Sequence, residues 1–249
     1  MSPKKRCTVI VVGSGFGGIA SALRMRAMGY NVLLLEKLKK IGGRAQVFQK
    51  NGFKHDAGPT VITAPFMFDD LFKLFNEDRK KYLNFVPLDP WYRFYFHDNT
   101  SFDYCRKISD TKKEISKFSK SDAKNYDKLL EVSKKIFEVG FLKLSDKPFL
   151  SFYSMLKQIP SLVKLKSYLT VSQLVKKYLK NPKIQSAFSI HPLLVGGNPF
   201  NTTSIYALIH FLERNWGVYF CIGGTGKITA ELKKLMIRND IKIKLDVNI

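Results

Sequence analysis

A glycine-rich segment between two strand-like runs constrains this chain more than any other part of its sequence. The apolar run Cys7–Val12 leads directly into a glycine cluster at residues 13–18, and a second apolar run, Asn31–Leu35, ends on Glu36. Short, β-branched apolar runs are typical of buried parallel strands. The residues between the two runs have the pattern of an amphipathic helix that stops at Gly29. Together these features predict a strand–helix–strand unit that binds a dinucleotide.

The glycines of the cluster have separate expected roles. Gly13 permits a tight turn out of the first strand, where a side chain would be strained. Gly15 lets the backbone approach a pyrophosphate, and Gly18 lets the helix pack close against the strand. Glu36, which follows Gly18 by 18 residues, is placed to accept hydrogen bonds from ribose hydroxyls. The start of the helix adds unpaired N–H groups and about half a positive charge facing the phosphates.

The chain is strongly basic. It has 42 Lys and Arg residues against 20 Asp and Glu, so its formal net charge is +22. Such a field favours anionic partners such as nucleic acid, acidic lipid or phosphate, although a general lysine bias would also produce it. Nucleic acid is disfavoured because the sequence lacks Arg-rich runs and RNA-type aromatic motifs. Three widely separated cysteines, Cys7, Cys105 and Cys221, indicate a reducing cytoplasm rather than a disulfide framework.

The sequence predicts neither secretion, nor a membrane span, nor a metal centre. The basic segment Met1–Arg6 precedes an apolar run, as in a signal peptide, but the glycine cluster interrupts that run. No uninterrupted apolar run reaches about 18 residues. The four histidines form no ligand-type pair; they are His55, His97, His191 and His210.

The pattern along the chain predicts three regions. Residues 1–63 are expected to form the nucleotide-binding core, 64–219 a mixed helical region with a β-hairpin, and 220–249 a return to the core. The hairpin is expected around Asp98 and Asn99. Because the chain ends on an apolar strand, we expect it to be incomplete at its C-terminus. Helices are expected over 66–76, about 121–142, within 149–180 and over 227–238, and a last strand over 241–245.

Several strings beyond the second strand resemble a known family. The segment Gly42-Gly43-Arg44 points to flavin rather than nicotinamide, and with the glycine cluster and Glu36 it resembles the FAD-binding half of amine-oxidase-like flavoproteins. Three further strings are similar to the bacterial-type phytoene desaturases, the carotenoid-forming enzymes. They are FKHDAGPTVIT at residues 53–63, LLVGGNPF at 193–200, and WGVYF followed by GGTG within 216–226. The resemblance runs along the whole chain and covers about the first half of a family member.

This resemblance implies a set of cofactor-binding residues. The FAD pyrophosphate would lie on Gly13, Ser14, Gly15, Phe16, Gly17 and Gly18. Glu36 would bind the adenosine ribose, and Lys37 beside it would also contact the cofactor. Gly43 and Arg44 would reach the pyrophosphate and the ribityl chain, Arg44 as a forked donor. Gly58, Pro59 and Thr60 would lie near the isoalloxazine, and the backbone from Val247 to Ile249 would lie at the adenine.

The resemblance also implies a fold and a reaction. The fold is α/β, a Rossmann-like FAD-binding βαβ domain with an inserted mixed α+β region that faces substrate or membrane. The reaction is desaturation of phytoene to more conjugated carotenes by hydride transfer to the flavin, with a quinone or oxygen as electron acceptor. A carboxylate suspected in the family would fall near Ser154, so we assign no catalytic residue. The alternatives are a related polyene isomerase, saturase or oxidase, a non-catalytic flavin-binding fragment, and a nicotinamide dehydrogenase.

One stretch of the middle region has two interpretations. Pro148–Thr170 alternates apolar side chains with Lys157, Lys164 and Lys166. It is expected either to rest on a membrane surface with its lysines on anionic headgroups, or to pack on the core as an ordinary amphipathic helix. The resemblance implies a cytoplasmic protein, peripheral at the inner face of the membrane, that acts on a hydrophobic polyene.

Overall fold

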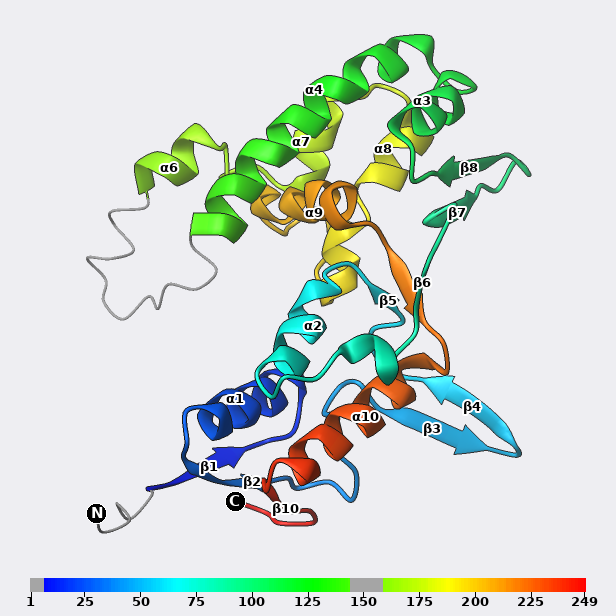
Figure 1. Cartoon of the computed structure of the whole chain (residues 1–249). Helices are drawn as coiled ribbons and strands as arrows, with labels where there is room; N and C mark the ends of the chain where they lie inside the picture. Colours follow the sequence, from blue (N-terminus) through cyan, green and yellow to red (C-terminus); the bar gives the residue numbers. More distant parts are fainter. Residues whose placement is uncertain (1–6, 144–158) are drawn as a thin grey trace. The chain divides into compact units, whose positions relative to one another are not determined.

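The chain divides into two compact units (Figure 1). The computed structural model describes residues 7–143 and 159–249. The first unit combines Met1–Pro87 with Val218–Ile249, and the second unit is Leu88–Gly217. The first unit therefore contains both ends of the sequence, and the second is an insertion within it.

A parallel sheet lies at the centre of the first unit. Its strands are β1 (Thr8–Val12), β2 (Asn31–Leu35) and β10 (Lys242–Lys244), in the order β1-β2-β10. α1 (Phe16–Ala27) connects β1 to β2, so the predicted strand–helix–strand unit is present. The other elements of this unit are β3 (Val47–Lys50), β4 (Phe53–Asp56), β5 (Val61–Ile62), α2 (Phe66–Lys73), the 3₁₀ turn η1 (Arg79–Lys81), β6 (Phe85–Pro87), β9 (Tyr219–Cys221) and α10 (Gly224–Arg238).

The core of the first unit is built from both ends of the chain. Leu34 of β2 is fully buried against Leu23 of α1 and Leu235 of α10, and burial of each such leucine contributes about 1.5–3 kcal/mol. The antiparallel sheet β5-β9-β6 joins the two segments a second time. Phe72 of α2 also belongs to this core. Because of this packing, the first unit extends to Pro87, whereas the sequence pattern places the end of the nucleotide-binding core at residue 63.

The second unit is mostly helical. The predicted hairpin is formed by β7 (Tyr92–Tyr95) and β8 (Ser101–Tyr104). α3 (Ile108–Ser116) was not expected, because only two of its side chains are buried and its sequence is mostly polar. The other elements are α4 (Lys120–Phe137), the π-helical η2 (Glu138–Lys143), α6 (Ile159–Lys164), α7 (Val171–Tyr178), α8 (Pro182–Phe188), the 3₁₀ turns η3 (His191–Val195) and η4 (Ser204–Ala207), and α9 (Leu208–Trp216).

The helical stretch expected within 149–180 is only partly visible. Residues 149–158 lie outside the described residues. Beyond them, α7 begins with a capping box in which Thr170 and Gln173 bond reciprocally. Pro182 begins α8 instead of simply ending a helix, since a proline in the first turn sacrifices no helical hydrogen bond.

A buried polar cluster lies at the centre of the second unit. Nε of Arg214 donates to Oη of Tyr126 at 3.1 Å, and Tyr126 lies 2.9 Å from Nε2 of His210. Oη of Tyr92 donates to Glu213 at 2.7 Å. His191 bonds the other oxygen of Glu213 at 3.1 Å and stacks on His210. Burial, reinforced by the neighbouring Arg214, holds the pKa of His210 well below its ordinary value.

Protonation of His210 should couple folding to pH. His210 stays neutral in the folded chain, while the unfolded chain binds a proton below about pH 6.5. The free energy of unfolding should therefore fall as pH drops below this value, by up to about 1.4 kcal/mol per pH unit. His210→Gln should remove this slope in urea titrations at a series of pH values. His97→Gln, at an exposed position, is the control; an unchanged slope in His210→Gln would contradict the assignment.

Candidate dinucleotide-binding site

A pocket of about 440 Å³ opens at the carboxyl ends of β1 and β2. This is the edge at which open α/β sheets bind ligands. The pocket brings together the predicted residues Gly13, Ser14, Gly15, Glu36, Lys37, Gly43, Arg44 and Ile249, and it is completed by Val12, Leu35, Leu38, Val247 and Asn248. The apolar members of the second group were not expected, apart from the backbone of Val247. They line the pocket because the last residues of β1 and β2, Val12 and Leu35, lie at this edge of the sheet.

The start of α1 lies at this pocket without a competing cap. Gly15 is the N-cap of α1, no side chain bonds the first turn, and no acidic residue lies within it. The first N–H groups of a helix have no intrahelical partner. They are therefore available to an anion in the pocket, as the sequence predicts.

Gly15 has no structural reason within the chain to be glycine. Its φ is −63°, which any residue adopts. A Cβ built on Gly15 would meet no atom of the protein within 4 Å. Gly18 differs, since a Cβ there would lie 2.0 Å from the carbonyl oxygen of Gly13. Close packing of helix and strand accounts for Gly18, whereas the open space beside Gly15 fits a ligand that approaches the backbone.

The carboxylate of Glu36 fixes the glycine loop. Its Oε2 accepts hydrogen bonds from the backbone N and the Oγ of Ser14, at 2.7 and 2.5 Å, and its Oε1 accepts from the backbone N of Leu38 at 2.9 Å. Burial alone would raise the pKa of Glu36, but these hydrogen bonds, and the charge of Lys37, lower it. Glu36 is therefore an anion that holds the loop, a role that the sequence pattern did not reveal.

The Gly42-Gly43-Arg44 segment packs directly on the glycine loop. The N–H of Gly42 donates to the carbonyl of Ser14 at 2.9 Å. Gly43 has a φ of +57°, and a Cβ there would lie 2.9 Å from Cα of Gly15. Both the left-handed backbone and this contact require glycine at residue 43. The packing places the exposed Arg44 at the pocket, although the two segments lie far apart in sequence.

The end of the chain forms another wall of the pocket. The backbone N–H of Glu36 donates to the carbonyl of Lys244 at 2.9 Å, and the backbone carbonyl of Glu36 accepts a hydrogen bond from the N–H of Val247 at 3.0 Å. Asn248 and the exposed Ile249 then line the pocket beside Glu36. Backbone pairing with β2 thus brings residues 247–249 to the wall of this pocket.

The remaining predicted residues do not line this pocket. Phe16 packs in the core, where its ring meets Phe68 edge-to-face at 5.7 Å, and Gly17 and Gly18 lie in the first turn of α1. Gly58, expected to leave room for a flat ligand, instead packs on the chain itself, since a Cβ there would lie 2.3 Å from the carbonyl oxygen of Arg44. Pro59 accepts a hydrogen bond from Thr225, and Thr60 follows it in the same exposed loop.

A second pocket lies nearby within the first unit. It has a volume of about 880 Å³ between the β3–β4 hairpin, α10 and residues 39–41. At one end Asp56 accepts a hydrogen bond from the backbone N of Thr225 at 3.0 Å and so caps α10. None of the predicted cofactor-binding residues lines this pocket.

Other expectations concern catalysis and metals. Within residues 7–143 and 159–249, no group of three or more His, Cys, Asp or Glu side chains could hold a metal ion. Ser154, near which the family's suspected carboxylate would fall, lies outside the described residues. No catalytic residue is assigned.

Comparison with known proteins agrees with this geometry. The family described as an NAD(P)-binding Rossmann-like domain matches residues 11–77. The chain is 45% identical over 225 residues to a lycopene-forming phytoene desaturase of Pantoea ananas, covering 90% of this chain and 46% of that protein. It is 41% identical over 240 residues to the lycopene-forming phytoene desaturase of Pseudescherichia vulneris, covering 96% of this chain and 49% of that protein.

A solved structure supports the fold. Cyclohexylamine oxidase from Brevibacterium oxydans aligns with 96% of this chain and 51% of its own, at 16% identity and a TM-score of 0.59. The expected Rossmann-like α/β fold is thus confirmed. The chain spans about half the length of the curated relatives that it matches. Over that shared length, the resemblance to the phytoene desaturases expected from the sequence is confirmed.

Proposed function

We propose that the pocket at the carboxyl ends of β1 and β2 binds the adenosine and pyrophosphate half of FAD. The observation that carries this proposal is Gly15, a glycine at the uncapped start of α1 with open space beside it. A ligand that lies close to the backbone gives that position in the pocket a reason to lack a side chain. The resemblance to the phytoene desaturases favours FAD over a nicotinamide cofactor.

Different residues of the chain would bind different parts of the cofactor. The N–H groups at the start of α1 would donate to the pyrophosphate, and Arg44 would add charge beside them. Glu36 retains acceptor capacity beyond its three hydrogen bonds and would accept from a ribose hydroxyl. The backbone of residues 247–249 would flank the adenine. Gly58, Pro59 and Thr60, held against Arg44 and α10, are proposed to lie nearer the isoalloxazine.

We propose that the whole protein to which these residues belong desaturates a carotenoid precursor. When bound, FAD supplies the acceptor for the hydride removed from the polyene. A hydrocarbon offers no group for a charged side chain to grip, so the protein's part is to orient the chain and exclude water. A quinone or oxygen is the proposed acceptor of the electrons.

We also propose that this reaction takes place at the inner face of the membrane, in the cytoplasm. The proposed substrate is a long hydrocarbon that dissolves in lipid rather than in water, and the chain carries a net charge of +22. In the part of the chain that the structure describes, no helix combines the length and apolar character needed to cross a bilayer. A peripheral contact fits these observations.

A side chain at residue 15 should displace the cofactor without unfolding the chain. Because the space beside Gly15 is free of protein atoms, Gly15→Ala and Gly15→Val should leave the temperature of unfolding nearly unchanged. Intrusion into the ligand's place costs about 1–3 kcal/mol, so Gly15→Val should weaken FAD binding by about tenfold or more, with Gly15→Ala intermediate. Flavin fluorescence titration measures both, and equal affinity across the series would contradict the proposed site.

A chimera should test the reaction. The matched half of the Pantoea ananas phytoene desaturase would be replaced by this chain and produced in a host that accumulates phytoene. Pigment analysis should show phytoene converted to more conjugated carotenes. The Gly15→Val form of the same chimera is the matched control and should leave phytoene in place. A chimera that binds flavin but leaves phytoene unchanged would contradict the proposed reaction.

A further inference from the structure

One long segment of the second unit contains no acidic residue. The sequence has no Asp or Glu between Asp146 and Glu213, while residues 159–212 carry six lysines. Glu213 itself is fully buried. In α4 and η2, Glu131 is paired with Lys135 and Glu138 with Lys134. Asp122 of α4 accepts hydrogen bonds from the backbone N–H groups of Lys180 and Asn181. Residues 159–212 therefore carry an excess of positive charge, although Lys183 among them pairs with Asp98 of the β7–β8 hairpin.

The same segment exposes apolar side chains. Leu193, Leu194 and Val195 are consecutive residues that are 60%, 41% and 53% exposed, and Phe200 is 70% exposed. Tyr168 is 71% exposed. Runs of three exposed apolar residues are uncommon on soluble surfaces unless they contact a partner.

Backbone hydrogen bonds join the stretches of chain that carry these exposed apolar residues. Ser172 donates its N–H to the carbonyl of Pro199, next to Phe200, and Ser204 donates its N–H to Leu169, next to Tyr168, at 3.0 and 2.7 Å. The N–H of Gly197 donates to the carbonyl of Pro192 at 2.8 Å and closes the loop that begins at Leu193. Residues 166–172, 192–197 and 199–204 are thus neighbouring stretches of backbone, and we call their exposed side chains together the apolar–basic surface.

Two lysines at the edge of this surface lie against each other. The side chain of Lys177, on α7, lowers the pKa of Lys166 through a hydrogen bond and through charge repulsion. Lys166 is held in place by Ser204, whose Oγ donates to its carbonyl at 2.9 Å, and its φ is +58°, which is uncommon for a residue with a side chain. Neighbouring lysines attract an anion such as the phosphate of a lipid.

We propose that the apolar–basic surface docks on an anionic phospholipid bilayer, with Leu193, Leu194, Val195, Phe200 and Tyr168 at the acyl boundary and the Lys166–Lys177 pair on lipid phosphates. This inference rests on the proposed function at a membrane and names the surface that makes the contact. Apolar side chains beside lysines are the combination that binds peripheral proteins to such bilayers. Residues 193–200 thereby gain a role that differs from cofactor binding.

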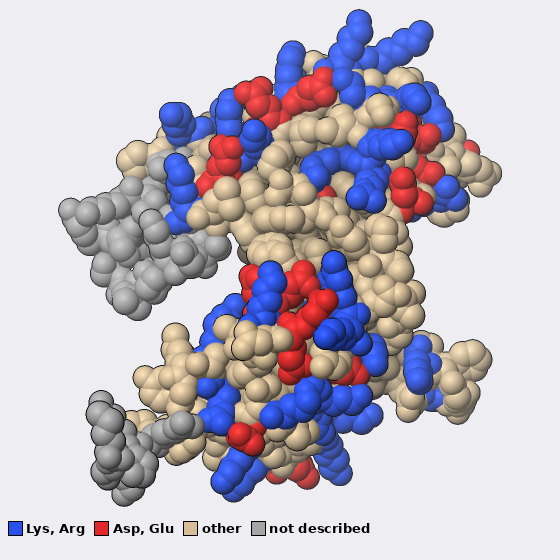
Figure 2. Space-filling model, viewed as in Figure 1, with Lys and Arg blue, Asp and Glu red and all other residues tan. Residues whose placement is uncertain are grey.

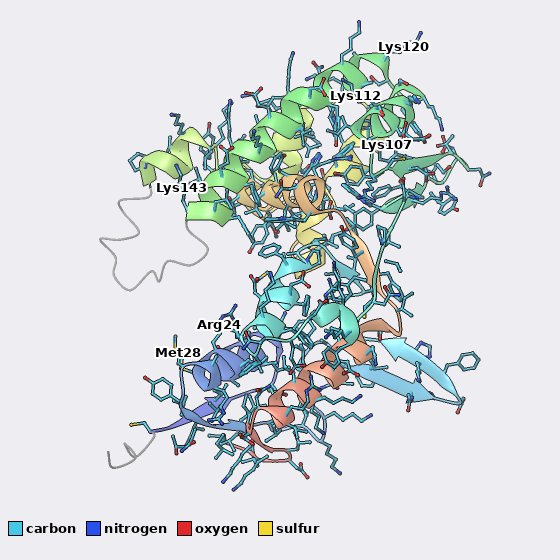
Figure 3. All side chains as sticks on the ribbon, viewed as in Figure 1. Arg24, Met28, Lys107, Lys112, Lys120 and Lys143 are labelled. Atoms are coloured by element: carbon cyan, nitrogen blue, oxygen red, sulfur yellow. The ribbon has the colours of Figure 1, made fainter. Side chains whose placement is uncertain are left out.

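Co-sedimentation with lipid vesicles tests this surface. The full chain should bind vesicles of equal parts phosphatidylcholine and phosphatidylglycerol, and bind pure phosphatidylcholine vesicles weakly. The double substitution Lys166→Glu with Lys177→Glu should reduce binding by about tenfold or more. The matched control changes the same charge at Lys107 and Lys120, exposed lysines of the α3–α4 region (Figure 3), and should reduce binding much less.

A second pair of variants tests the apolar contact. Phe200→Ser should weaken vesicle binding several-fold, whereas Tyr95→Ser, at a position that is 76% exposed on the β7–β8 hairpin, should not. Equal losses in the test and control variants of either pair, or no preference for anionic vesicles, would overturn the docking surface. Thermal unfolding confirms that each variant folds. Flavin binding, measured on the same samples, separates the docking surface from the proposed cofactor site. A chain that binds FAD but not vesicles would overturn the docking surface alone. A chain that binds vesicles but not FAD would overturn the proposed function alone.

Discussion

The hydrogen bonds between Glu36 and Ser14 are the interaction on which the candidate site depends. They join the end of β2 to the loop after β1, so that the glycines lie at the carboxyl edge of the sheet. Gly42 then bonds the same serine, and Val247 bonds the backbone of Glu36. Segments that are distant in sequence therefore meet at Ser14 and Glu36. A side chain at residue 36 without a hydrogen-bond acceptor would leave the N–H groups of Ser14 and Leu38 without this partner.

Much of this arrangement could be predicted from local patterns. The bounds of β2 and the position of the β7–β8 hairpin follow from apolar runs and turn residues that act over short distances. The pocket residues of the glycine motif and of the Gly42-Gly43-Arg44 segment were also predictable, because the resemblance assigned both segments to one cofactor. The resemblance also implied that the backbone at 247–249 would complete it.

Other features could not be read from the sequence because they depend on tertiary packing. The hydrogen bonds that the carboxylate of Glu36 accepts from Ser14 and Leu38 were not predicted, because the sequence pattern indicated only a ribose contact for it. Gly58 was expected to leave room for a ligand, yet the space beside it is filled by the backbone of Arg44. The cluster around His210 and Glu213 joins residues more than 80 positions apart, such as Tyr126 with His210, and no local pattern reports such pairs.

Charge is distributed over the surface of both units, with acidic side chains among the basic ones on the face seen in Figure 2. The net charge of +22 therefore does not by itself define a binding surface. The distinguishing feature of the second unit is a local one, the absence of acidic residues from 147 to 212 together with exposed apolar side chains. Electrostatic attraction and apolar contact would there act at the same place.

The central claim is that the pocket at β1 and β2 holds the adenosine and pyrophosphate half of FAD. Competition among ligands tests it most directly, because ADP carries that half and FMN lacks the adenosine. Calorimetric titration of the chain with FAD in the presence of each competitor should show displacement by ADP and little effect of FMN. Displacement by FMN as effective as that by ADP would contradict the account.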